Sequence, residues 1–154
     1  MNLLFDTNII LWIARDTTGY KIIEAMNPQD KIVYVSFVNI AEAPSIAFQN
    51  NWGFSKIRRM EAFLENVRVI EVSDVLMNLY IGIDSFSQRS HRNFDNYDFK
   101  TPRNMGKNDL WIAATASLLD LTLVTTDGDF DHLSDNFLNL RKIIPESLQN
   151  LLRK

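Results

Sequence analysis

The chain of 154 residues contains no cysteine and only two histidines, His91 and His132. Without cysteine there is no disulfide bond, thiolate metal site or cysteine nucleophile, and a reducing, cytoplasmic location is favoured. The histidines have neither the spacing of a metal-binding pair nor a pattern typical of a nucleophile's base, so we expect both to be incidental. Any metal chemistry must therefore depend on oxygen ligands.

Long hydrophobic runs are also missing. The apolar segment 1–14 has no basic leader and contains Asp6, so it does not fit a signal peptide. The run 110–119 is shorter than a bilayer span and includes Thr115. We predict no membrane segment and, from the length and a hydrophobic content of 46%, one compact domain over residues 1–154.

Short apolar runs alternate with segments of helical periodicity along the chain. Strands are expected at 3–5, 32–35, 67–72, 121–125 and 140–144. Helices are expected after Asp6, after Ser36, over 55–66 and 108–119 with Ser55 and Asn108 as caps, from 73 past 83, after Asp129, and from Pro145. This alternation predicts a three-layer α/β/α sandwich with a mainly parallel central sheet.

Four acidic residues have positions that point to one edge of this sheet. Asp6 directly follows the first strand, Asp127 follows the fourth strand by two residues, and Glu42 lies early in the helix after the second strand. Asp109 opens a helix that leads into a strand, and such a helix begins at the carboxyl edge of a parallel sheet. Ligands of these sheets bind beyond that edge, so we expect the four carboxylates to lie together.

Each acid also has a purely structural explanation. Asp6 and Asp127 can cap helices, Asp109 can complement a helix dipole, and Glu42 can be solvated. Two ionised carboxylates about 5 Å apart repel by about 3 kcal/mol at an effective dielectric constant near 20, so a cluster of four requires a cation. Oxygen ligands favour Mg²⁺ or Mn²⁺, and such a site suits phosphodiester hydrolysis.

Four segments of the chain together resemble the PIN-domain family, and most closely its VapC toxins. They are LLFDTNIILW at 3–12, SFVNIAEA at 36–43, NDLWIAATA at 108–116 and LVTTDGDF at 123–130. The segments occur in the family's order and span nearly the whole chain. The resemblance implies a Mg²⁺- or Mn²⁺-dependent endoribonuclease of a type II toxin-antitoxin system.

The resemblance also implies roles for individual residues. Asp6, Glu42, Asp109 and Asp127 match the family's catalytic, metal-binding acids. Asn8 and Thr125 match residues that support those acids from behind, and Asp129 matches a further, less regular acid that we also expect in a supporting role. Implied partners are a cognate antitoxin, a second copy of the chain in a homodimer, and structured RNA such as tRNA or rRNA.

The segment 89–107 departs from the family pattern because it is longer than usual, and it is too long for an ordinary connection. The net charge of the chain is −3, yet segment 85–107 holds five cations and two anions. We predict that its cations contact RNA phosphates, namely Arg92, Lys100, Arg103 and Lys107. Its aromatic residues Phe94, Tyr97 and Phe99 either stack on unpaired bases or anchor the loop.

Two other functions remain open at this level. A catalytically silent RNA-binding or ribosome-associated module would keep the fold without the reaction. A haloacid-dehalogenase-like phosphatase would use Asp6 as a nucleophile, but it would need a second Asp at position 8, where this chain has Asn8.

Overall fold

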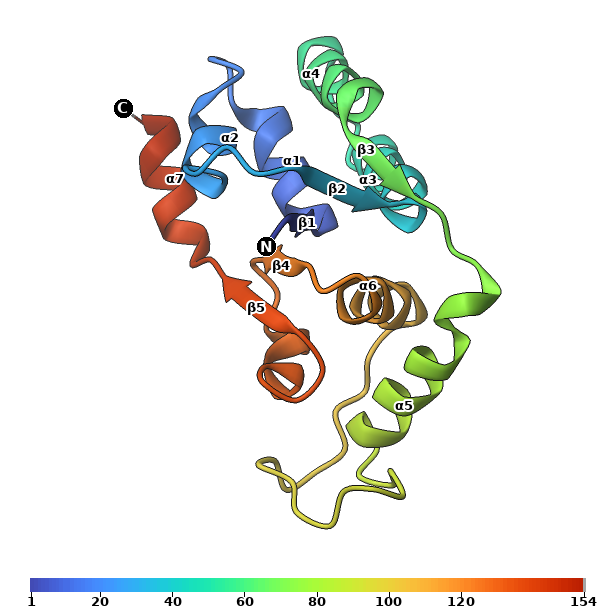
Figure 1. Cartoon of the computed structure of the whole chain (residues 1–154). Helices are drawn as coiled ribbons and strands as arrows, with labels where there is room; N and C mark the ends of the chain where they lie inside the picture. Colours follow the sequence, from blue (N-terminus) through green and yellow to red (C-terminus); the bar gives the residue numbers. More distant parts are fainter. Residues whose placement is uncertain (154) are drawn as a thin grey trace.

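The computed structural model of the chain describes residues 1–153. Five parallel strands form its central sheet (Figure 1). The strands are β1 Leu3–Phe5, β2 Val33–Ser36, β3 Arg68–Ile70, β4 Thr122–Thr125 and β5 Asn139–Lys142. Their order across the sheet is β3-β2-β1-β4-β5, and every pair is parallel. The predicted fold class is therefore confirmed; the last position of the predicted domain, 154, lies outside the described residues.

Helices cover both faces of the sheet. One face packs against α1 Thr7–Arg15, α2 Lys21–Met26, α3 Phe37–Gln49, α4 Phe54–Asn66 and α7 Pro145–Arg153. The other packs against α5 Met77–Ser87, α6 Lys107–Leu118 and the 3₁₀ segments η1 Asp74–Leu76 and η2 Gly128–Leu133. None of the helices within residues 1–153 has the length and apolar character needed to cross a membrane.

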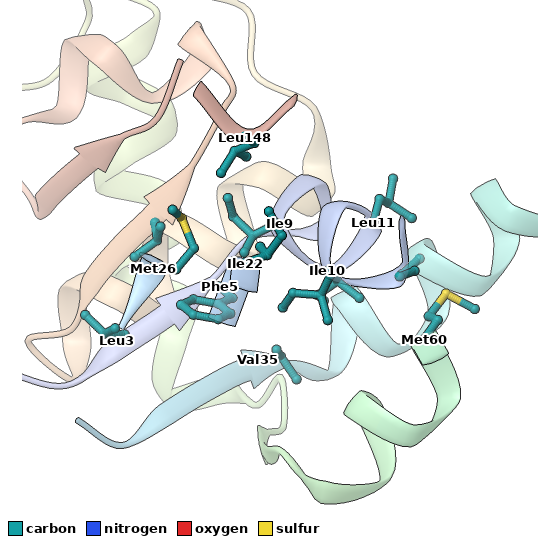
Figure 2. Close-up of a cluster of buried hydrophobic side chains, with 14 of the residues drawn as sticks. Leu3, Phe5, Ile9, Ile10, Leu11, Ile22, Met26, Val35, Met60 and Leu148 are labelled. Atoms are coloured by element: carbon teal, nitrogen blue, oxygen red, sulfur yellow. The ribbon is translucent and has the colours of Figure 1, made fainter. Parts of the chain in front are cut away.

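The period-2 alternation of the strands divides the core into two clusters. Leu3 and Phe5 of β1 point into the cluster beneath α1, whereas Leu4 between them belongs to the cluster beneath α6. Figure 2 shows Phe5 beside Ile9, Ile10 and other apolar residues of the first cluster. Each such fully buried side chain contributes roughly 1.5–3 kcal/mol, so the central strand is held from both faces.

The structure corrects several local predictions. Helix α2 was not predicted, because six residues are too few to show helical periodicity. In the first turn of α2, the Ile22 amide donates a hydrogen bond of 3.0 Å to the buried carboxylate of Asp16. Ser55 and Asn108 are not caps, since Gly53 and Gly106 occupy those positions and the helices begin earlier. Asn108 has another partner, described below.

The loop between α5 and α6 is anchored by its aromatic residues. Phe94, Tyr97 and Phe99 place their rings 4.8, 5.2 and 5.5 Å from the ring of Phe86, which is buried at the end of α5. All three are half-buried against the second core cluster. Anchoring of the loop is therefore observed for these aromatics, and stacking on RNA bases stays a prediction.

The strand order creates the crevice that a site needs. The chain runs from β1 through β2 to β3 on one side of the sheet and returns to place β4 on the other side of β1. At such a switch point the loops after the two adjacent strands diverge and leave a crevice at their carboxyl ends. Asp6 follows β1 and Asp127 follows β4, so the switch point brings both acids to the same crevice.

Candidate active site

Asp6 lies at the centre of the carboxyl edge and is 3% exposed. Its Oδ1 accepts a hydrogen bond of 2.8 Å from the Thr7 amide, which makes Asp6 the cap of α1, and its Oδ2 accepts one of 2.7 Å from the Thr125 hydroxyl. Burial raises the pKa of Asp6 to about 6, although both hydrogen bonds favour the ionised form. The charges of Glu42 and Asp127 raise it further, so the capping role and the clustered site coexist.

Asp127 and Asp129 belong to one tight turn after β4. The Asp127 amide donates to the Thr125 hydroxyl oxygen over 3.0 Å, and the Asp129 amide donates to Asp127 Oδ1 over 2.9 Å. The Thr125 hydroxyl thus contacts Asp6 and the Asp127 backbone at once. Thr125 is fully buried, and its position agrees with the supporting role that the resemblance implied.

Glu42 approaches the site from α3, and an amide from α6 holds it. Asn108 Nδ2 donates to Glu42 Oε2 over 2.8 Å. These two residues and Asp109 line a hollow of ≈ 370 Å³ together with Gly106 and Lys107. Asn108 was predicted only as a helix cap; its adjacency to Asp109 was the available signal that it belongs to the site.

The pKa of Asp109 reflects the nearby charges of the other acids. Burial raises its pKa to about 7, and the charges of four other carboxylates add to this effect, in order Asp6, Asp127, Glu42 and Asp129. Asp6, Glu42 and Asp127, the other members of the predicted quartet, therefore all lie within electrostatic reach of Asp109. A separation of Asp6 from Asp109 into different solvent regions would have excluded a shared site, and the structure shows the opposite.

Three of these carboxylates can share one cation. Asp109, Asp127 and Asp129 each offer an oxygen within 4.8 Å of the other two. Opposed ligands of Mg²⁺ lie about 4.2 Å apart, twice the usual bond length, so small side-chain movements bring the three oxygens into its coordination shell. The residues fit a hard divalent ion, and Asp129 joins this group more closely than its predicted supporting role implied.

Asn8 is the member of the predicted set with the least visible role. It lies in the first turn of α1 and is half-buried, and within residues 1–153 its side chain forms no hydrogen bond with another residue. A different amide, Asn39, supports this region instead. Asn39 Nδ2 donates to the Thr7 hydroxyl over 2.8 Å, and Asn39 Oδ1 accepts from the Ser36 amide over 2.8 Å.

The Asn39 network joins the start of α3 to the start of α1, directly behind Asp6. Both Asn39 and Ser36 are fully buried, and they form a capping box at the start of α3. This network was not predicted from the sequence. A serine followed three positions later by a side chain that can bond back to it was the available signal.

The predicted RNA-binding cations have different environments. Arg92 and Lys100 are exposed in the α5–α6 loop, and Lys107 is exposed beside the hollow at the start of α6. Arg103 is half-buried, and its Nη2 donates to the Gly128 carbonyl oxygen over 3.1 Å. Lys107 and Arg103 are therefore next to the acids, whereas Arg92 and Lys100 belong to the outer loop.

A protein-family model matches most of the chain, including the five acids Asp6, Glu42, Asp109, Asp127 and Asp129. The model of the PIN domain family matches residues 3–136, which include all five of them. The chain belongs to the PIN domain family. It is 30% identical over 135 residues to the ribonuclease VapC1 of Haemophilus influenzae strain R2866, a match that covers 86% of this chain and 92% of that protein.

Several solved structures share the fold of this chain. VapBC2 from Rickettsia felis, bound to a DNA fragment from its promoter, contains a chain that aligns with a TM-score of 0.68 and 20% identity, over 93% of this chain and 99% of that one. VapBC-1 from nontypeable Haemophilus influenzae aligns with a TM-score of 0.64 and 24% identity, over 92% and 98%. At these identities the PIN fold is what the alignments establish.

Proposed function

We propose that this PIN domain protein is a Mg²⁺- or Mn²⁺-dependent endoribonuclease, and that it is a VapC-like toxin neutralised by a cognate antitoxin. The observation that carries the proposal is the convergence of Asp6, Glu42, Asp109, Asp127 and Asp129 on one crevice, where the pKa of Asp109 rises to about 7. Mutual repulsion of these carboxylates destabilises the fold, and a bound divalent cation would offset it. The ribonuclease named among its relatives supports RNA as the substrate.

Asp109, Asp127 and Asp129 are the residues that would hold the ion. Asp6 and Glu42 lie near this group, since their charges act on Asp109. A divalent ion in this position supplies a water of lowered pKa and stabilises charge on the leaving oxygen of a phosphodiester. The protein contributes the orientation of the ligands. Thr125 fixes Oδ2 of Asp6, and Asn108 fixes Oε2 of Glu42, so the carboxylates do not need to reorganise when substrate binds.

RNA would approach over the basic loop. Lys107 lies beside the hollow that Glu42 and Asp109 line, at a position suited to a phosphate next to the scissile bond. Arg92 and Lys100 are exposed farther along the loop and would contact the flanking backbone, with Arg103 at the inner border. The aromatic side chains of this loop pack against the second core cluster. Recognition would therefore depend on the shape and charge of the RNA backbone, as suits structured tRNA or rRNA.

The proposed protein partners are an antitoxin and a second copy of the chain. The VapBC structures of similar fold support an antitoxin as a partner. A small gene beside the coding sequence, encoding a DNA-binding head and a disordered tail, would add independent support.

Cleavage of RNA by purified protein tests the proposal. We expect the wild type to cut structured RNA with Mg²⁺ or Mn²⁺, and to lose this activity in excess EDTA and in the Asp6→Asn variant. Asp120→Asn is the matched control, because Asp120 is exposed and precedes β4, at the opposite end of that strand from Asp127. Its positive φ of 52° is one that Asn adopts readily.

Three outcomes separate the possible functions. Equal cleavage by wild type and Asp6→Asn would point to a contaminating nuclease and contradict the proposal. Binding of RNA without cleavage under any metal would favour a silent RNA-binding module. Capture of an aspartyl-phosphate on Asp6 would favour a phosphatase of the haloacid-dehalogenase type.

A further inference from the structure

The α5–α6 loop contacts the acidic turn through Arg103. The Arg103 amide donates to the Ser87 carbonyl over 2.7 Å, which ties this part of the loop to the end of α5. From there the guanidinium reaches the Gly128 carbonyl oxygen over 3.1 Å. Arg103 is thereby connected to α5 by its backbone and to η2 by its side chain.

Gly128 is the residue between Asp127 and Asp129. The Asp127 amide donates to the Thr125 hydroxyl oxygen. The peptide group that joins Gly128 to Asp129 is held at both ends, because its N–H donates to Asp127 Oδ1 and its carbonyl oxygen accepts from Arg103. A rotation of that peptide would move the side chain of Asp129 relative to Asp127. The bond from Arg103 opposes such a rotation.

A second contact ties the other end of η2 to the same helix. His132 Nε2 lies 2.6 Å from the Ser87 hydroxyl oxygen, and both residues are buried. Phe99, from the same loop, packs its ring 5.2 Å from the His132 ring. The segment that follows Asp127 is therefore held at its start by Arg103 and at its end by Ser87 and Phe99.

The sign of the electrostatic effect distinguishes positioning from simple charge. A guanidinium near a cation-binding site repels the cation, so a charge acting alone would weaken metal binding, and its removal would strengthen it. A guanidinium that fixes the ligands has the opposite effect, because its removal lets the ligand oxygens move apart. The two roles predict opposite changes in metal affinity.

We propose that Arg103 is a positioning residue of the acidic site, which braces the Gly128 carbonyl and so sets the spacing of Asp127 and Asp129 for a divalent cation. This inference rests on the proposed metal-dependent function. It assigns Arg103, and the long loop that carries it, to assembly of the site, whereas Arg92 and Lys100 are exposed in the outer part of that loop.

Mn²⁺ titration of purified variants tests the positioning role without RNA. Arg103→Met removes a charge-assisted hydrogen bond that stabilises the turn. We expect this loss to weaken Mn²⁺ binding by about tenfold. Arg103→Lys keeps the charge and one donor group of similar reach, and it should recover part of that loss. Arg89→Asn is the control, because Arg89 is exposed in the same loop and its positive φ of 59° suits Asn.

Hydrogen exchange of the amides in 127–133, measured without metal, gives a second result. We expect faster exchange in Arg103→Met than in wild type and no change in Arg89→Asn. Unchanged or tighter Mn²⁺ binding by Arg103→Met, or unchanged exchange, would overturn the inference. If Arg103→Met does not fold, Arg103→Lys is used in its place. Wild-type Mn²⁺ affinity together with wild-type exchange rates in Arg103→Lys would then overturn the inference. If the wild type binds no Mn²⁺, the proposed function fails, and exchange alone decides whether Arg103 braces the turn.

Discussion

The hydroxyl of Thr125 donates a hydrogen bond of 2.7 Å to Oδ2 of Asp6, although the two residues are 119 positions apart in the sequence. The same hydroxyl oxygen accepts a hydrogen bond from the Asp127 amide over 3.0 Å. One buried side chain at the end of β4 therefore connects the acid after β1 to the acidic turn after β4. The parallel pairing of β1 with β4, which places Phe5 beside Val124, makes this contact possible.

Replacing Thr125 by Val keeps the shape of the side chain and removes both hydrogen bonds. We expect RNA cleavage to fall by about 10- to 100-fold, the usual effect of losing a group that orients a metal ligand. The free energy of unfolding should fall by about 1–3 kcal/mol, because the buried Asp6 oxygen loses a donor. Thr125→Ser keeps the hydroxyl and is the control in both assays; a Val variant as active as the Ser variant would contradict the role given to this bond.

Asp109→Asn should stabilise the metal-free protein while it removes function. The neighbouring carboxylates repel an ionised Asp109, and the amide relieves that repulsion. Asp109 is only partly buried, and after allowance for solvent screening we expect a gain of about 0.5–1 kcal/mol at pH 8 in EDTA. Thermal unfolding detects this as a rise of about 1–4 °C in Tm.

The same variant should lose the stabilisation by Mn²⁺ that the wild type shows. Asp120→Asn removes an equal charge from an exposed position, and its Tm should match that of the wild type in both conditions. A lower Tm for Asp109→Asn in EDTA would mean that its carboxylate has a favourable partner, which the cluster of acids does not provide.

The stability of the metal-free protein should depend on pH through Asp6. The pKa of Asp6 is raised from 3.8 to about 6 in the folded protein, so between these values the folded state binds more protons than the unfolded state. The contribution of Asp6 is therefore fully present below about pH 4 and is lost as the pH rises through about 6. Unfolding by urea in EDTA, measured from pH 4 to 8, reports this change.

Buried His132 acts in the opposite direction in the same pH range. Burial lowers its pKa to about 4, so its contribution is present above the ordinary value of 6.5 and is lost as the pH falls toward 4. Comparison with Asp6→Asn isolates Asp6, because His132 is common to both proteins. The stability of Asp6→Asn relative to wild type should rise between pH 4 and 6; a constant difference would show that the pKa of Asp6 is not raised.

The outer loop cations should govern the affinity for RNA. Changing Arg92 and Lys100 together to Glu places repulsive charge where phosphate contacts are proposed. We expect weaker RNA binding and a flatter salt dependence, with the slope reduced by about 1 for each phosphate that the loop no longer neutralises. Tm and Mn²⁺ affinity should stay near wild type because both side chains are exposed.

The matched control for the loop is a double change on another surface. Lys56 and Arg58 are exposed on α4, and changing both to Glu alters the net charge by the same amount. If that variant loses RNA affinity as strongly as the loop variant, overall charge and not the loop controls binding.

Much of the fold follows from patterns that extend over a few residues. Apolar runs such as 3–5 and 121–125 predicted the strands, and strand-helix alternation predicted the parallel sheet. Because side chains after parallel strands share one edge, the positions of Asp6 and Asp127 predicted a common site. The short helix α2 and the glycine caps Gly53 and Gly106 were missed, since neither creates a long periodic signal.

The sequence by itself predicted which acids converge, because Asp6 and Asp127 follow strand ends, and Glu42 and Asp109 lie in helices that begin at the same edge of the sheet. The tertiary structure alone decided which neighbours hold them: Asn108 on Glu42, Asn39 on Thr7, and Arg103 on the Gly128 carbonyl. These partners come from elements that are remote along the chain and meet only because of the strand order β3-β2-β1-β4-β5. A hydrogen bond depends on distance and direction in space, and local sequence carries no information on either for residues so far apart.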